Sequence, residues 1–277
     1  MGQTPRMELT DRDVPTVLGR IRVRVGGEGP AMLFWPSLLM DGSLWAAQAG
    51  HFGTGRRVVL VDPPGHGASE PLTRGFSFDE CARCVVDILD GLDLTAADFV
   101  GNSWGGMIGG TFAARHPERV RTAVLMNCTA SPAGLRQRLE YPLLTRVAKL
   151  LGGIRPPLTR SVVTAFTGPT TRREKPDVVA AIKASAERAD PRSASWAVTS
   201  VVPRRPDQRA LFGGIRTPVL VVAGEEDATF PVAETRAMAE AIPGARFEVL
   251  PRTAHLAALE SPAEVNALIE DFLAARR

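Results

Sequence analysis

The sequence predicts an α/β protein with a mostly parallel central sheet, helices on both faces of the sheet and an inserted helical cap. From Gly19 onward, short apolar runs alternate with longer segments of helical period. Residues 58–61 are apolar throughout and are followed by Asp62-Pro63-Pro64-Gly65, which is typical of a strand buried on both faces. Between Ser131 and Arg209 the strand-like runs disappear, and prolines separate helical patches. These three observations define the fold class.

The individual elements follow from local patterns. A glycine-rich turn at residues 26–30 separates the first two strands, and Ser77 is a suitable N-cap for the first long helix. Strands are expected at residues 20–25, 31–35, 58–61, 120–126, 219–223 and 246–250, with a further strand ending at Phe99-Val100. Helices are expected at residues 78–92, 107–115, 233–241 and 263–275, with helical patches at 135–151 and 178–189.

This rhythm divides the chain into two units. The core is expected to comprise residues 1–131 and 209–277, and residues 132–208 are expected to form the helical cap. We expect the cap to lie over the carboxyl ends of the core strands, because ligands of open α/β sheets bind there.

Composition excludes several classes of protein. The chain has 277 residues, 44% hydrophobic and 23% charged, as ordinary globular proteins have. The net charge of +3 comes from scattered arginines, so no nucleic-acid partner is expected. The three cysteines Cys81, Cys84 and Cys128 indicate a reducing compartment, and with no export signal or membrane-spanning segment recognised we expect a cytoplasmic protein without a membrane partner. Cys81 and Cys84 lie within one expected helix without a second ligand pair, so neither a metal nor another cofactor is expected. Oligomeric state has no signal in the sequence.

The most informative segment is Gly101-Asn102-Ser103-Trp104-Gly105, between an expected strand and an expected helix. It fits the pattern G-x-S-x-G, in which a sharp strand-to-helix turn exposes a serine hydroxyl. A serine is a weak nucleophile until a neighbouring base takes its proton and a carboxylate orients that base. Ser103 is therefore the candidate nucleophile.

The base and the acid should follow the serine in the order acid, then histidine. His255 is the candidate base, because it comes after the expected strand 246–250 and the other three histidines do not fit this place. Glu225, Glu226 and Asp227 all follow the strand 219–223 and compete for the role of the acid. Asp227 is preferred, since the shorter carboxylate at the far end of such a turn has the usual reach.

A developing oxyanion requires two backbone N–H donors. One is expected from Trp104, directly after the nucleophile, and the other from the loop after the strand 31–35, with Leu38 as the preferred residue. In the expected cap, eight apolar side chains are candidates for the pocket wall or for packing on the core: Leu143, Leu144, Leu150, Leu151, Val162, Val163, Phe166 and Trp196.

Taken together, the motifs resemble the α/β-hydrolase superfamily. They are the serine turn, Asp62-x-x-Gly65-His66-Gly67-x-Ser69, Gly224-x-x-Asp227 and the His255 segment. Within the superfamily, Pro36-Ser37-Leu38-Leu39 is similar to the early loop of 3-oxoadipate enol-lactonases, although Pro36 and Leu39 replace their Asn and Gly. The cap does not align with that subgroup, so the resemblance implies a reaction class and no particular substrate.

The expected function is therefore that of a cofactor-free serine hydrolase that cleaves a small carboxylic ester or lactone. Ser103, Asp227 and His255 would act as a triad through an acyl-enzyme. Carbon–carbon hydrolases and perhydrolases use the same triad and stay open as alternatives. A non-hydrolytic receptor or isomerase that reuses the pocket is the alternative from a different class.

Overall fold

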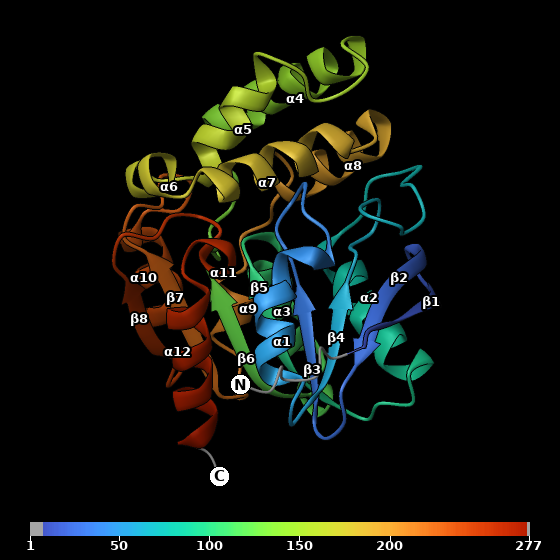
Figure 1. Ribbon diagram of the computed structural model, residues 1–277, viewed down its shortest axis with the longest axis vertical. Coiled ribbons are helices and arrows are strands. Elements are labelled where there is room, and N and C mark those ends of the chain that lie inside the picture. The colour runs from blue at the N-terminus through green and yellow to red at the C-terminus, as the bar shows by residue number, and fades with distance from the viewer. Residues whose placement is uncertain (1–7, 276–277) are drawn as a thin grey trace, which may run out of the picture.

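The computed structural model describes residues 8–275, and an eight-stranded, mostly parallel sheet forms its centre (Figure 1). The strands lie in the order β1-β2-β4-β3-β5-β6-β7-β8, with β2 antiparallel to both of its neighbours and all other pairs parallel. Their bounds are β1 Thr10–Thr16, β2 Gly19–Gly26, β3 Ala31–Trp35, β4 Arg57–Val61, β5 Ala97–Asn102, β6 Val120–Met126, β7 Val219–Gly224 and β8 Arg246–Leu250. Every residue of β3, β5 and β7 is buried, as expected for inner parallel strands.

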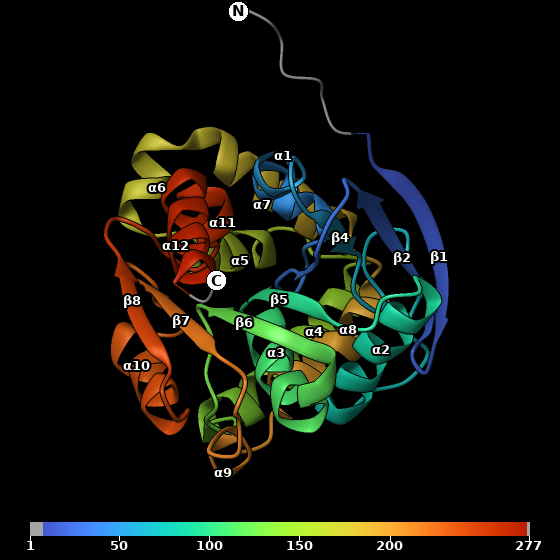
Figure 2. The ribbon, with the colours of Figure 1, turned by 90° about the horizontal axis from the view of Figure 1, so that it is seen from below.

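Helices cover both faces of the sheet, which confirms the predicted fold class (Figure 2). One face carries α1 Ala46–Phe52, α11 Ala257–Glu260 and α12 Pro262–Ala274. The other carries α2 Phe78–Gly91, α3 Trp104–Arg115, α9 Arg209–Phe212 and α10 Val232–Ala241. Two short 3₁₀ turns are η1 Gly42–Trp45 and η2 Pro117–Arg119. Ser77 caps α2 as predicted, because its hydroxyl accepts the Glu80 N–H while the Glu80 carboxylate accepts the Ser77 N–H.

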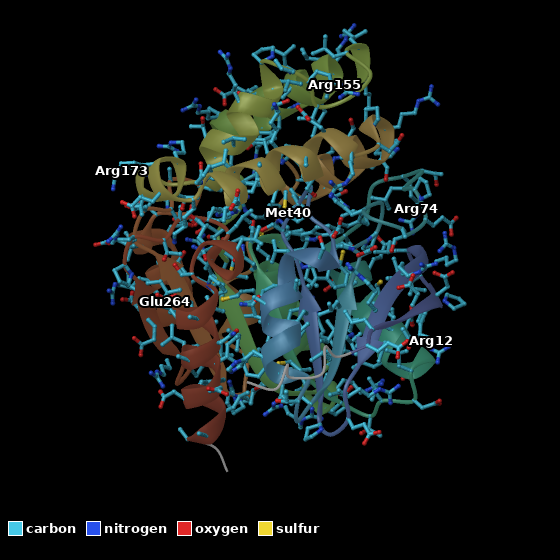
Figure 3. All side chains as sticks on the ribbon, in the orientation of Figure 1. Arg12, Met40, Arg74, Arg155, Arg173 and Glu264 are labelled. Atoms are coloured by element: carbon cyan, nitrogen blue, oxygen red, sulfur yellow. The ribbon has the colours of Figure 1, made fainter. Side chains whose placement is uncertain are left out.

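A layer of helices lies beyond the carboxyl ends of the parallel strands (Figure 1). It consists of α4 Leu135–Leu150, α5 Leu158–Phe166, α6 Pro169–Glu174, α7 Pro176–Arg188 and α8 Pro191–Val201. These helices fall within residues 132–208, the segment predicted to form a cap, and we call them the cap helices. Figure 3 shows Met40 at the junction between the core and the cap helices and Arg155 in their outermost part.

The edge strand β1 was not predicted, and its composition explains why. Five of its seven residues are polar, and Val14 is its one buried side chain. Asp11 and Asp13 pair with Arg22 on β2, at 2.6 and 2.7 Å, so ion pairs on the exposed face add to the backbone pairing of these two strands. The predicted segment 1–131 also includes residues 1–7, which lie outside the described part, as do residues 276–277. Within residues 8–275, no helix combines the length and the apolar character needed to cross a bilayer.

Candidate active site

Ser103 occupies a strained turn between β5 and α3. Its backbone has φ +55° and ψ −112°, and residues other than glycine rarely adopt a positive φ. A Cβ on Gly101 would lie 2.2 Å from the carbonyl carbon of Gly105, and a Cβ on Gly105 would lie 2.1 Å from the Trp35 carbonyl oxygen. Both flanking glycines are thus required by the close approach of backbone, and the turn holds the serine at the carboxyl end of a central strand.

Asp227 and His255 meet beside this turn. They follow β7 and β8, and the Asp227 Oδ2 atom lies 2.9 Å from His255 Nδ1. The same oxygen accepts a hydrogen bond from Asn127 Nδ2 at 3.1 Å, while Oδ1 accepts the N–H groups of Thr229 and Phe230. All these partners donate to the carboxylate oxygens, so the imidazole proton that faces Asp227 is on Nδ1.

The other nitrogen of the imidazole is available. His255 Nε2 is buried and has no hydrogen-bond partner within residues 8–275. Ser103 and His255 border the same cavity, and no hydrogen bond joins the serine hydroxyl to the imidazole there. Phe166 of α5 stacks on the imidazole with ring centroids 5.3 Å apart, and Phe230 packs at 5.7 Å. The ring is therefore held by a carboxylate at one nitrogen and by aromatic contacts on its faces.

The two glutamates that compete with Asp227 in the sequence lie elsewhere. Glu225 accepts the N–H of Arg252 at 3.0 Å. Glu226 accepts the N–H and the hydroxyl of Thr170, at 2.9 and 2.6 Å, at the start of α6. Of these three acidic side chains, the structure brings Asp227 to the imidazole.

Leu38 and Leu39, in the loop after β3, border the cavity and differ in how their amides are bonded. The N–H of Leu39 donates to His66 Nε2 at 3.0 Å, whereas the neighbouring Leu38 N–H has no hydrogen-bond partner within the described chain. Leu39 has φ +62°, so it keeps the conformation that favours glycine at the position where enol-lactonases carry one. Trp104 is the first residue of α3, and the amides in the first turn of a helix have no partner within that helix. Its indole packs against Phe76 at 5.5 Å and does not border the cavity.

The cavity has a volume of about 190 Å³ and is mostly apolar. Of the eight apolar residues considered for its wall, Leu144, Val162 and Phe166 border it. Leu143, Leu150 and Leu151 instead point outward with exposed fractions of 63%, 79% and 45%, while Val163 and Trp196 pack on the core. These leucines were misplaced because both faces of α4 carry leucine, and composition alone does not show which face turns inward.

Arg205 is the single Lys, Arg, Asp or Glu side chain in the described wall of the cavity. It is 5% exposed, and its Nε and Nη2 atoms donate to the Ser131 carbonyl at 2.9 Å and to Gln137 Oε1 at 3.0 Å. No carboxylate oxygen of residues 8–275 lies within 4.0 Å of the guanidinium. Burial lowers the pKa of Arg205, but a guanidinium stays charged in proteins. The cavity therefore has one positive charge in an apolar wall.

Comparison with known proteins agrees with this geometry. Residues 30–262 match the sequence profile of the family described as alpha/beta hydrolase fold. The chain belongs to the α/β-hydrolase family. It is similar to 3-oxoadipate enol-lactonase 2 of Acinetobacter baylyi, at 28% identity over 87% of each chain. A 2-hydroxymuconate semialdehyde hydrolase of Pseudomonas putida is 30% identical, over 90% of this chain and 88% of the relative.

An ester hydrolase and a solved structure complete the comparison. A pimeloyl-[acyl-carrier protein] methyl ester esterase of Chromobacterium violaceum is 30% identical, over 83% of this chain and 88% of the relative. The crystal structure of the enol-lactonase from Burkholderia xenovorans superimposes with a TM-score of 0.86 at 25% identity, covering 95% of this chain and all of that one. Relatives of this α/β hydrolase thus include enzymes named as an enol-lactonase, a semialdehyde hydrolase and a methyl ester esterase.

Two asparagines of this α/β hydrolase position the site, and the sequence pattern predicts no role for either. Asn102 Nδ2 donates to the His255 carbonyl at 2.8 Å and to Ser37 Oγ at 3.0 Å, so it links the histidine loop to the loop after β3. Asn127 Nδ2 donates to Asp227 and, at 2.9 Å, to the Ala254 carbonyl. Their places, Asn102 at the end of β5 and Asn127 directly after β6, were the available signal.

His66 lies in the loop from Asp62 to Ser69, and the structure places this loop beside the site. His66 Nδ1 lies 3.0 Å from the Pro64 carbonyl and donates to it, which leaves Nε2 to accept the Leu39 N–H. Burial lowers the pKa of the His66 imidazole below its ordinary value of 6.5, so the neutral ring that this arrangement needs is favoured.

The cap helices are attached to the loops that carry Asp227 and His255. Glu226 binds Thr170 at the N-terminus of α6, as described above. Glu260 accepts the N–H groups of Ala254 and Leu256, at 3.2 and 2.9 Å, and also the hydroxyl of Thr171 on α6. Burial raises the pKa of the Glu260 carboxyl above its ordinary value. Two carboxyl groups therefore join α6 to the core at the site itself.

Proposed function

We propose that this α/β hydrolase cleaves a carboxylic ester or a lactone through an acyl-enzyme on Ser103. One observation carries the proposal. An imidazole with Asp227 at 2.9 Å from Nδ1 and with Nε2 unpartnered borders the same cavity as a serine held at φ +55°. This is the arrangement in which a histidine can take the proton of a serine.

In the proposed reaction, Ser103 Oγ attacks the substrate carbonyl while its proton moves to His255 Nε2. The tetrahedral oxyanion accepts hydrogen bonds from the N–H groups of Leu38 and Trp104. Collapse of this intermediate breaks the bond to the alcohol oxygen, which takes the proton from His255. A water molecule then releases the acyl group by the same steps in reverse, and Asp227 holds the imidazole throughout.

The charge of the cavity narrows the substrate class. A buried charge is unfavourable unless it is paired, and Arg205 has no carboxylate within 4.0 Å among the described residues. The Glu234 carboxylate acts on it only from farther away, and the Phe230 ring lies 5.5 Å from the guanidinium. Because a guanidinium binds a carboxylate with two parallel hydrogen bonds, we infer that the preferred ester or lactone carries a carboxylate. The 190 Å³ cavity favours a short apolar chain between that group and the reacting carbonyl.

Labelling with a small fluorophosphonate tests the nucleophile before any substrate is known. Intact-mass spectrometry should show one adduct on the wild type and none on Ser103→Ala. Turnover of a panel of short esters and lactones should also disappear in this variant. Hydrolysis that survives Ser103→Ala unchanged would refute the mechanism. A small molecule that binds tightly and is recovered unchanged would favour the receptor alternative instead.

A carbon–carbon hydrolase is the second candidate. It is favoured by the 30% identity to a 2-hydroxymuconate semialdehyde hydrolase, over 90% of this chain. Assaying a vinylogous 1,5-diketone acid beside an ester of matched length distinguishes the two. Faster cleavage of the diketone by more than about tenfold would make carbon–carbon hydrolysis the main activity.

A further inference from the structure

The outer face of α4 is apolar and exposed. Leu135, Leu139, Leu143 and Leu150 are 73%, 68%, 63% and 79% exposed. The first three follow at intervals of four residues, and Leu150 falls on the same side because fifteen residues complete about four helical turns. Isolated exposed leucines are ordinary on protein surfaces, whereas a row of four along one helix marks an interaction surface.

The opposite face of α4 borders the catalytic cavity. Gln137, Tyr141, Leu144, Thr145 and Ala148 all contribute to its wall. The outward leucines are therefore not needed for packing against the core. Figure 1 places α4 in the layer farthest from the central sheet, so its outer face meets nothing else within residues 8–275.

The charge around this face has one sign. Residues 135–160 contain six Lys or Arg side chains and a single acidic one, Glu140, whereas the whole chain has a net charge of only +3. Arg136 uses Glu140 as an ion-pair partner at 2.7 Å. Arg138, Arg146 and Arg155 are exposed, and Figure 3 shows Arg155 at the outer edge of the cap helices.

Exposed leucines ringed by cations match one kind of partner. We propose that the outer face of α4 docks this protein on an anionic lipid surface, with the leucines inserted at the headgroup boundary and the arginines among the phosphates. An interfacial helix combines these two features. A second copy of the chain would bring the same cations against each other, so charge opposes self-association through this face. The proposal revises the expectation of no membrane partner and does not depend on the chemistry of Ser103.

Docking would also place the cavity close to the lipid. The residues of α4 that border the cavity and the leucines of its outer face are separated by one helix diameter, about 10 Å. The same helix would therefore form the roof of the catalytic cavity and the contact with the membrane surface.

Vesicle co-sedimentation of the full chain tests the proposal. With vesicles of equal parts phosphatidylglycerol and phosphatidylcholine, the wild type should sediment, and raised salt should weaken the binding. The double variant Leu135→Asp/Leu139→Asp should lose at least about tenfold in partitioning. Val249→Asp is the matched control, because Val249 is a 37% exposed apolar residue on β8, and it should bind as the wild type does.

A circular dichroism spectrum and a thermal midpoint like those of the wild type show that each variant is folded, and Ser103→Ala should still bind the vesicles. The proposal is overturned if the wild type stays in the supernatant or binds pure phosphatidylcholine equally well. It is also overturned if the double variant binds unchanged. Light scattering of the lipid-free protein tests whether a second copy of the chain binds this face instead. If the wild type is a dimer, the double variant is a monomer and neither binds vesicles, the face is a self-association surface and the proposal is overturned.

Discussion

Replacement of Asp227 by asparagine changes one functional group and leaves the shape of the site nearly constant. The Asn Oδ1 atom can still accept the N–H groups of Thr229 and Phe230, which lie 2.8 and 3.1 Å from the present Oδ1. On the other side, the new NH₂ group faces the donors His255 Nδ1 and Asn127 Nδ2, at 2.9 and 3.1 Å. The imidazole can relieve this conflict by moving its proton to Nε2, the atom that must accept the Ser103 proton.

The expected loss of activity follows from having the imidazole proton on Nε2 instead of Nδ1. In triad enzymes this change lowers kcat by about 10⁴-fold, which corresponds to about 5 kcal/mol of transition-state stabilisation. We therefore expect Asp227→Asn to reduce kcat/KM for a p-nitrophenyl ester, and the fluorophosphonate labelling rate, by about 10⁴-fold. The thermal midpoint should change little, because the backbone donors keep their acceptor.

Glu226→Gln is the matched control, since it removes a carboxylate from the adjacent position. Glu226 binds Thr170 on α6, so its loss should lower the free energy of unfolding by about 1–2 kcal/mol and leave kcat/KM within about threefold. The reasoning is refuted if Asp227→Asn keeps more than a tenth of the activity, and above all if Glu226→Gln proves the more damaging change.

Three other perturbations have defined outcomes. Gly105→Ala should lower the free energy of unfolding in urea by about 3 kcal/mol and abolish fluorophosphonate labelling, because the new Cβ would lie 2.1 Å from a backbone oxygen. Gly50→Ala is the control, since a Cβ there has nothing within 4 Å, and it should leave the stability unchanged or raise it. Because burial lowers the pKa of His66 in the folded state, the unfolded state takes up the imidazole proton first as pH falls. The stability contributed by the neutral ring is therefore complete above about pH 6.5 and is lost as pH falls toward the folded pKa. Between about pH 7.5 and 5, the free energy of unfolding of His66→Asn, measured in urea, should fall less steeply with pH than that of the wild type, and an equally steep fall would contradict this. Arg205→Gln should raise KM at least about tenfold for an ester that bears a carboxylate, and leave KM unchanged for the same ester with a neutral amide in place of the carboxylate. Arg204→Gln, at an exposed neighbouring position, should leave both KM values unchanged. Equal losses on both substrates in Arg205→Gln would indicate a purely structural role.

The core and the positions of the candidate site residues could be predicted because local patterns determine them. Strands β3 to β7 are short apolar runs, and Ser103, Asp227 and His255 each come within a few residues of a strand's carboxyl end. Those ends meet at one edge of a parallel sheet, so chain order alone brings the three residues together.

The rest depends on tertiary contacts that leave no local signal. Asn102 and Asn127 stand at strand ends, but only the folded chain shows which carbonyl or carboxylate each amide meets. The left-handed conformation of Leu39 runs against the preference of its residue type, and the buried His66 stabilises it through the Leu39 N–H. Strand β1 escaped detection because an edge strand joined by ion pairs lacks apolar alternation.

Because Glu226 and Glu260 bind α6, this helix stays attached to the core loops when other cap helices move. A rigid swing of all five cap helices would pull on the loops of Asp227 and His255, because both carboxyl groups bind α6 and lie next to those residues. Helix α5 is tied to the same loops, because Phe166 stacks on the His255 imidazole and the Ala165 carbonyl accepts the Thr229 hydroxyl. Of the helices that border the cavity, α4 packs mainly on α8 and contacts neither loop, so we expect it to move or to change in sequence while Asp227 and His255 keep their alignment.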